Sequence, residues 1–171
     1  MILFLTLSII FVLFVISYQD FKERKISWLT IPFIVILFLV YAFVESPSFK
    51  NYINDVGFNL LFIVIQLSIL FIYFSIRVGK FINIINTKIG LGDILFFVAL
   101  TFAFSPVNFI LFYVGSLSII TIVFLFIKSL FKNVSSEIPL AGAMSVMLIV
   151  WYVISLFIQT LKPLNDFILG E

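Results

Sequence analysis

The chain has 171 residues, of which 64% are hydrophobic and only 11% are charged, with a formal net charge of +2. This composition excludes an ordinary soluble domain, in which about a quarter of the residues are charged, and indicates an all-α integral membrane protein. The chain contains no His and no Cys, which excludes a Ser-His-Asp triad, a Cys nucleophile and zinc bound by His or Cys. Acid–base chemistry near neutral pH would therefore depend on carboxylates, Lys or Tyr.

Six apolar runs separated by polar breaks predict a bundle of six transmembrane helices. They cover residues 2–18, 28–44, 57–76, 93–104, 107–127 and 138–158. Because a span needs about 20 apolar residues, the run over 93–104 predicts a short fourth helix. It ends at Ser105-Pro106, since proline disfavours a helical conformation in the residue before it, and a tight hairpin to the fifth helix is expected. The whole chain, residues 1–171, is expected to form a single transmembrane domain with no soluble domain.

The positions of the basic residues predict the orientation of this bundle. With the N-terminus outside, eight of the ten Lys and Arg residues lie on the inner side and two on the outer side. The inner set is Lys22, Arg24, Lys25, Arg77, Lys80, Lys88, Lys128 and Lys132, and the outer set is Lys50 and Lys162. Cytoplasmic loops carry an excess of Lys and Arg, so this asymmetry predicts an outside N-terminus. The slight positive charge thus reflects topology and does not indicate a nucleic-acid partner.

The eight acidic residues sort into surface positions and site candidates. Four fall in outer loops or the tail, where we expect solvated surface: Glu45, Asp55, Asp166 and Glu171. Glu23 lies within the basic inner loop, and Asp20, Asp93 and Glu137 lie at the inner membrane face of the predicted bundle. Asp20 ends the first span, where the alternative to a functional role is an interfacial residue paired with Arg24 one helical turn on.

Asp93 begins the fourth span and follows two glycines in the stretch Gly90-Leu91-Gly92-Asp93. One reading is a carboxylate that caps its helix N-terminus. That reading does not account for the glycines, which allow unusual backbone angles or the close approach of another chain. Irregular backbone at membrane depth is tolerated only where it is buried in protein or lines a wet cavity.

Asp20 and Asp93 are expected on the same membrane face at the ends of two helices, which makes them candidates for a catalytic pair. Two carboxylates brought close together do not both ionise easily, so one holds a proton near neutral pH. One can then act as a base on water while the other protonates a carbonyl oxygen. This aspartic-protease chemistry uses no cofactor, and ionisable groups in membrane segments are functional candidates by default.

These residues resemble two motifs of the type IV prepilin peptidases and the related preflagellin peptidases, which are intramembrane aspartyl proteases. The stretch from Gly90 to Asp93 reproduces the family's GxGD motif. The first motif runs from Asp20 to Ile26 with the family's spacing, but Ser27 and Trp28 stand where Pro and Asn are usual. The stretch Glu137-Ile138-Pro139 is similar to the family's Ile-Pro-rich start of the last helix.

The resemblance implies catalysis by Asp20 and Asp93, with Gly90, Gly92, Glu137 and Pro139 shaping the site or binding substrate. The implied substrate is a prepilin-like protein with a basic leader and a hydrophobic helix, cleaved at the cytoplasmic face of the inner membrane in contact with lipid. Many members carry a Cys-rich insert and also methylate the cleaved product; this chain has no Cys, so no methyltransferase activity is expected. Nothing in the sequence indicates an oligomeric state.

Two alternatives to an aspartyl peptidase remain open from the sequence. Many family members have a Lys two residues after the GxGD Asp, where this chain has Leu95, and that departure favours a non-catalytic six-span protein. Such a protein would be a degenerate peptidase, a pilus assembly factor or a small transporter; for a transporter, Gln66 and Ser68 are the main polar residues in mid-span. A Ser-Lys peptidase is less favoured, because no Ser-Lys pair lies inside a span.

Overall fold

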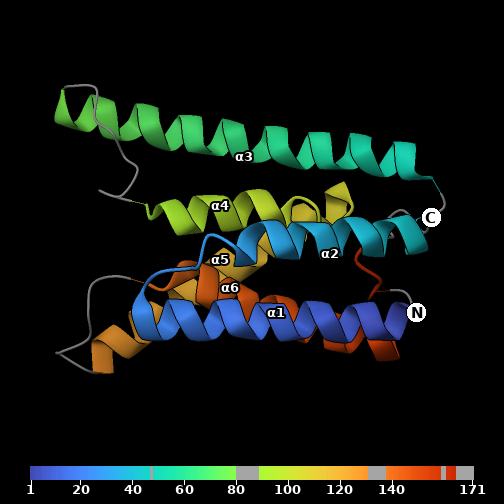
Figure 1. Cartoon of the computed structure of the whole chain (residues 1–171). Helices are drawn as coiled ribbons and strands as arrows, with labels where there is room; N and C mark the ends of the chain where they lie inside the picture. Colours follow the sequence, from blue (N-terminus) through green and yellow to red (C-terminus); the bar gives the residue numbers. More distant parts are fainter. Residues whose placement is uncertain (47, 80–88, 131–137, 159–160, 165–171) are drawn as a thin grey trace.

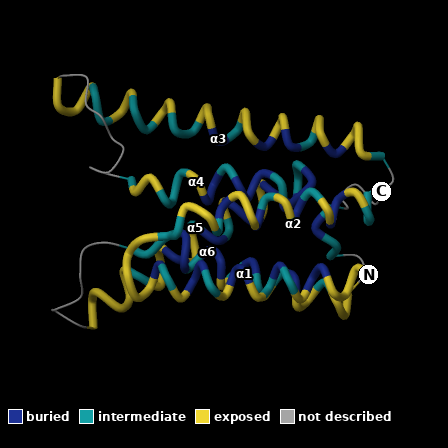
Figure 2. The backbone as a smooth tube through the Cα atoms, viewed as in Figure 1, coloured by how far each residue is buried: buried dark blue, intermediate teal, exposed yellow. Residues whose placement is uncertain are grey.

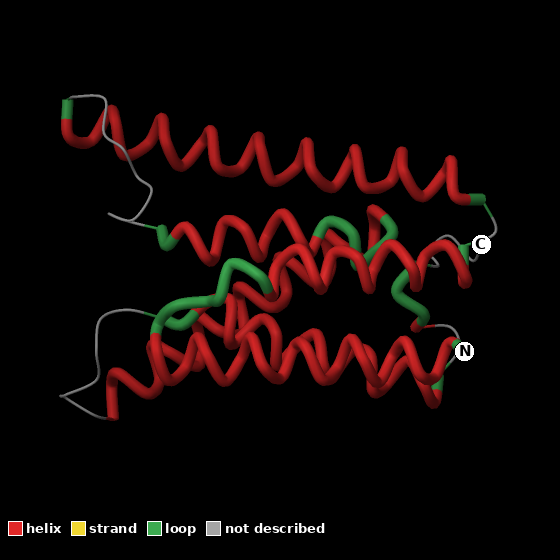
Figure 3. The backbone as a smooth tube through the Cα atoms, viewed as in Figure 1, coloured by secondary structure: helices red, strands yellow, loops and turns green. Residues whose placement is uncertain are grey.

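A computed structural model describes residues 1–46, 48–79, 89–130, 138–158 and 161–164 of the chain, and these ranges are built from helices and their connections (Figures 1 and 3). The helices are α1 (Ile2–Glu23), α2 (Thr30–Glu45), α3 (Phe49–Val78), α4 (Leu91–Leu100), α5 (Pro106–Leu130) and α6 (Leu140–Phe157). Each corresponds to one of the six predicted runs. α3 is longer than its predicted run because a polar first part, which includes Lys50 and Asp55, extends the helix toward its N-terminus.

The lengths of the helices divide them into two groups. Four are long and apolar enough to cross a membrane, namely α1, α3, α5 and α6. α2 has 16 residues and α4 has 10, which correspond to about 24 Å and about 15 Å of helix, whereas a bilayer core is about 30 Å thick. The protein is therefore an all-α membrane protein, and the prediction of a short fourth helix is confirmed.

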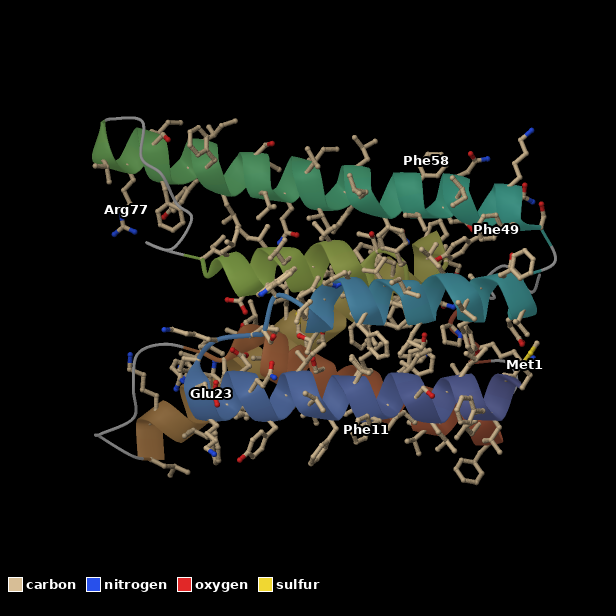
Figure 4. All side chains as sticks on the ribbon, in the orientation of Figure 1. Met1, Phe11, Glu23, Phe49, Phe58 and Arg77 are labelled. Atoms are coloured by element: carbon tan, nitrogen blue, oxygen red, sulfur yellow. The ribbon has the colours of Figure 1, made fainter. Side chains whose placement is uncertain are left out.

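The helices lie side by side with their ends gathered at two ends of the bundle (Figure 1). α1 packs most extensively against α6 and α2, while α3 contacts the bundle through α5, α2 and α4. Met1 and Phe49 lie at one end, and Glu23 and Arg77 lie at the other (Figure 4). The chain therefore leaves one end with α1, returns to it with α2, and leaves again with α3.

The surface of the bundle is apolar, and its core combines aliphatic and aromatic side chains. Buried residues face the interior, while α3 is exposed along most of its outer side (Figure 2). Phe11 on α1 and Phe58 on α3 project away from the bundle (Figure 4), and their exposed fractions are 68% and 65%. Such exposed apolar side chains suit a helix that faces lipid. In the core, Phe97 of α4 meets Tyr113 of α5 edge to face, with ring centroids 5.4 Å apart, and this contact joins the two helices of the predicted hairpin.

The C-terminal end of α4 lies inside the bundle, and α3 supplies hydrogen bonds to the backbone that follows it. The Asn59 side-chain amide donates to the carbonyls of Thr101 at 3.1 Å and Phe104 at 2.8 Å. The Tyr52 hydroxyl donates to the carbonyl of Phe102 at 2.9 Å. Carbonyls released at a helix end need partners when no water reaches them, so these two side chains explain how α4 can end within the protein.

At the same end of the bundle, residues 161–164 pack against the start of α5. The Pro163 carbonyl accepts hydrogen bonds from the Ser105 amide at 3.1 Å and from the Asn108 side chain at 3.2 Å. Lys162 forms an ion pair with Glu45 at the end of α2, and the Glu45 side chain is only 8% exposed. The prediction of a solvated surface position for Glu45 was therefore wrong: the returning segment covers this carboxylate.

Candidate active site

Three helix ends meet at the end of the bundle opposite to this ion pair. α1 ends here, because Arg24 adopts a left-handed conformation with φ 53° and ψ 27° and its amide donates to the Asp20 carbonyl. α4 and α6 both begin here, at Leu91 and Leu140. Asp20 thus lies in the last turn of α1 and Asp93 in the first turn of α4, each beside the N-terminus of α6.

The two carboxylates bind consecutive backbone amides of α6. The amide of Ala141 donates a hydrogen bond to Asp93 Oδ1 at 3.0 Å, and the amide of Gly142 donates to Asp20 Oδ2 at 2.6 Å. Because the two donors belong to neighbouring residues, the carboxyl groups of Asp20 and Asp93 lie close together, near enough to interact electrostatically. The structure therefore brings together the two residues that the sequence singled out, and we call them the Asp pair.

The N-terminus of α6 suits this arrangement for a general physical reason. The first amides of a helix have no partner within the helix, and the helix dipole favours negative charge there. Pro139, the N-cap residue of α6, contributes no side-chain cap, although its carbonyl accepts from the amide of Ala143. Asp20 and Asp93 take over the capping role from two other helices. Pro139 thus lies directly before the helix whose first amides bind the two carboxylates.

The alternative reading of Asp20 as a residue paired with Arg24 holds in part, because Arg24 interacts electrostatically with the Asp20 carboxylate. Asp20 is nevertheless not a solvated position. Its residue is only 7% exposed, and its carboxylate is bound by the amide of Gly142. The alternative for Asp93 holds in part, because this carboxylate also interacts with the amide of Gly90, the N-cap residue of its own helix. Asp93 thus links the N-termini of α4 and α6.

The glycines of the motif allow close approach and do not require unusual backbone angles. Gly90 has φ −64° and ψ 140°, which any residue can adopt, so the expectation of a special backbone conformation at Gly90 was wrong. A Cβ atom at Gly90 would lie 3.0 Å from Asp93 Oδ2, closer than side chains normally approach. A Cβ atom at Gly92 would lie 3.5 Å from Ile26, which is an ordinary contact.

The residues that depart from the family motifs lie around the Asp pair without entering it. The Ser27 amide donates to the Gln19 side chain at 3.0 Å, which ties the chain after α1 back onto that helix. Trp28 and Leu95 are 74% and 39% exposed. The predicted site residue Glu137 lies outside the described residues.

Two site residues were not selected from the sequence, namely Ala141 and Gly142, which act through their backbone amides. A signal for them was present in the run of small residues from 141 to 143, which follows Pro139 and Leu140. Small residues in membrane helices allow close packing between helices. In the part of the chain that the structure describes, no three acidic side chains converge as metal ligands, and the chain has no His or Cys.

The described residues thus form a helical membrane protein with two adjacent carboxylates at one end of its bundle. Residues 7–126 match the model of the type IV leader peptidase family. The match includes most of α1, all of α2 to α4 and most of α5, and therefore both members of the Asp pair. The chain belongs to the type IV leader peptidase family, and the resemblance read from its motifs is confirmed. Searches among curated proteins and among solved structures found no match.

Proposed function

We propose that this protein is an aspartic endopeptidase that removes the leader peptide of prepilin-like proteins, with Asp20 and Asp93 as its catalytic residues. The observation that carries the proposal is the binding of both carboxylates to consecutive amides of α6. Both residues also fall within the region that matches the family of leader peptidases. No cofactor takes part in the proposed reaction, and no methyltransferase activity accompanies it.

The proposed mechanism uses one protonated and one ionised carboxyl group, the state favoured when two carboxyl groups lie close together. The ionised group takes a proton from a water molecule, and the water oxygen attacks the carbonyl carbon of the scissile peptide bond. The protonated group gives its proton to the carbonyl oxygen, which forms a tetrahedral intermediate. The C–N bond then breaks as the leaving nitrogen receives the proton that the first carboxyl group took from water. The other carboxylate takes back a proton from a hydroxyl of the intermediate as the carbonyl re-forms, which restores the starting state of the pair. The amides of Ala141 and Gly142 hold one oxygen of each carboxyl group in place.

The proposed topology has six spans, an outside N-terminus and the Asp pair at the cytoplasmic face of the inner membrane. It is supported by the basic residues at the end of the bundle that carries the Asp pair. The described members of this set are Lys22, Arg24, Lys25, Arg77 and Lys128, whereas Lys80, Lys88 and Lys132 lie outside the described residues. α2 and α4 would cross where neighbouring helices cover their ends or where the bilayer thins locally.

The proposed substrate has a short basic leader followed by a hydrophobic helix that lies in the membrane. Cleavage at the junction of the two would place the scissile bond at the level of the Asp pair. A basic leader requires an acidic contact at this membrane face, which Glu23 and Glu137 would supply. Glu23 is exposed at the end of α1, in a position to meet such a leader.

A cleavage assay in membranes tests this proposal. The protein is expressed together with a prepilin-like protein from its own genome, and the size of the substrate is followed. We expect Asp20→Asn and Asp93→Asn each to lower the rate by at least about 1,000-fold, as for other catalytic groups that act as a unit. Asp55→Asn is the matched control, because this carboxylate lies near the start of α3 at the opposite end of the bundle. Cleavage that survives either change in the Asp pair would contradict the mechanism.

The second candidate function is that of a non-catalytic membrane protein, such as a pilus assembly factor. The observation in its favour is the presence of Ser27, Trp28 and Leu95 at positions where the family pattern differs. If the native chain cleaves none of the prepilin-like proteins of its genome, this second function is preferred. Leu95→Lys is then the first change to test for recovered cleavage.

A further inference from the structure

Gly142, like Gly90, leaves no ordinary room for a side chain, because the side chain of an Asp lies against it. A Cβ atom built on Gly142 would lie 3.0 Å from both Cβ and Oδ2 of Asp20. Side chains almost never approach so closely, so a methyl group at position 142 requires something to move. The carboxylate of Asp20 occupies the space that a side chain would take, and this allows it to reach the amide of the same residue at 2.6 Å.

The backbones on both sides of this contact are held by the core. α1 and α6 form the most extensive helix pair of the bundle, and Ile16, Ala141 and Met144 beside the contact are completely buried. Packed interiors of this kind respond poorly to added volume. A methyl group at residue 142 would therefore displace the Asp20 side chain more readily than it would separate the two helices.

We infer that Gly142 is a positioning residue of the proposed peptidase, which sets the place of the Asp20 carboxylate beside Asp93 by having no side chain. This inference rests on the proposed function for its catalytic consequence. Gly142 itself does not take part in bond breaking. Its amide and the space above its Cα atom fix one member of the Asp pair relative to the other.

The kinetic test compares Gly142→Ala with Gly115→Ala in the purified full-length protein. The substrate is a synthetic peptide with a basic leader followed by an apolar helical segment. A misplacement of about 1 Å in a reacting group lowers rates by about 100-fold. A Cβ atom 3.0 Å from Asp20 requires a smaller shift, so kcat of Gly142→Ala is expected to fall by about tenfold. KM is expected to stay within about threefold, because the leader and the apolar segment bind elsewhere. Gly115 lies within α5 with no atom within 4 Å of its Cβ position, and its variant should keep the native kcat.

A second test measures the contact without any cleavage. Asp20→Gly removes both atoms that the new methyl group would meet, so it should relieve the effect of Gly142→Ala. Melting temperatures in detergent micelles are measured for the native protein, both single variants and the double variant. Gly142→Ala should lower the melting temperature of the native protein but have little effect on Asp20→Gly. The same cycle with Gly115→Ala should show no coupling.

The two tests separate the inference from the proposed function. Additive effects on melting temperature would overturn the inference, and so would a native kcat in Gly142→Ala. If the native protein cleaves no substrate, the proposed function fails, and the thermal cycle alone decides whether Gly142 places Asp20. Coupling between residues 20 and 142 together with a loss in kcat at unchanged KM would establish the positioning role.

Discussion

The two glycines before Asp93 have different surroundings and therefore different tolerance to substitution. Gly90 lies under the Asp93 carboxylate, whose Oδ2 is 3.0 Å from the place of a Cβ atom. Gly92 lies within α4 with room for a methyl group against Ile26. Of the two glycines in the motif, Gly90 thus makes room for the Asp93 carboxylate, whereas Gly92 leaves unfilled space beside Ile26.

We expect Gly90→Ala to lower kcat by about tenfold, because Asp93 must move away from the new methyl group, a modest displacement on the scale of catalytic misplacements. Gly92→Ala should keep the free energy of unfolding within about 1 kcal/mol of the native value, since alanine at a helical position without steric conflict is neutral or stabilising. Peptide cleavage and thermal unfolding of both variants check this. If Gly92→Ala is stable but cleaves poorly, Gly92 serves the approach of the substrate; if Gly90→Ala keeps full activity, the contact with Asp93 has no catalytic importance.

At the scale of the helices, the turn that follows short α4 depends on α3 for the partners of its carbonyls. Asn59 is only 2% exposed and bonds two carbonyls beyond the end of α4. The hydrogen bonds fix α4 against α3, and the other end of α4 carries Asp93. The stability of the site thus depends on an interaction at the far end of the same helix.

Asn59→Ala should therefore lower the free energy of unfolding by about 2 kcal/mol, because buried carbonyls are left without a donor. Asn54→Ala is the matched control, since Asn54 lies on the same helix and is exposed, and surface changes usually cost less than about 0.5 kcal/mol. Denaturation in detergent micelles, followed by circular dichroism, measures both. Equal stability of the two variants would show that the end of α4 finds other partners.

The helices were predictable from the sequence, but the contacts between their ends were not. Apolar runs and polar breaks determine each helix locally, so all six were predicted. α1 ends at Glu23 and α3 begins at Phe49, outside their predicted runs, because polar residues extend both helices. The same-side placement of Asp20 and Asp93 followed from counting spans. Their joint binding to α6 did not, because Asp20 and Gly142 are 122 positions apart and the donors are backbone amides, which every sequence contains. Gly90 was predicted to allow an unusual backbone angle or the close approach of another chain, whereas its angles are ordinary and the group close to it is the Asp93 side chain.

For the whole molecule, the Asp pair lies at one end of the bundle, so the orientation of the bundle in the membrane determines which face carries the pair. Glu23 and Arg77 lie at one end of the bundle and Phe49 at the other (Figure 4). α2 connects the two ends although it is shorter than a usual span. If α2 crosses the bilayer, the topology with six spans holds; if it does not, there are fewer spans. The same question decides whether the proposed cleavage takes place in the cytoplasm.

The absence of native Cys makes this question accessible, because any introduced Cys is the sole thiol in the chain. Glu23→Cys and Asn51→Cys change exposed positions on either side of α2 and leave every basic residue in place, so the charge bias that sets orientation is unchanged. In right-side-out vesicles, a membrane-impermeant maleimide should label Asn51→Cys and not Glu23→Cys, and in inverted vesicles the pattern should reverse. Detergent-solubilised protein, in which both should react, is the control for thiol accessibility. Labelling of both variants from one side would mean that α2 does not cross, whereas a fully reversed pattern would place the Asp pair outside and exclude a substrate whose leader is cleaved in the cytoplasm.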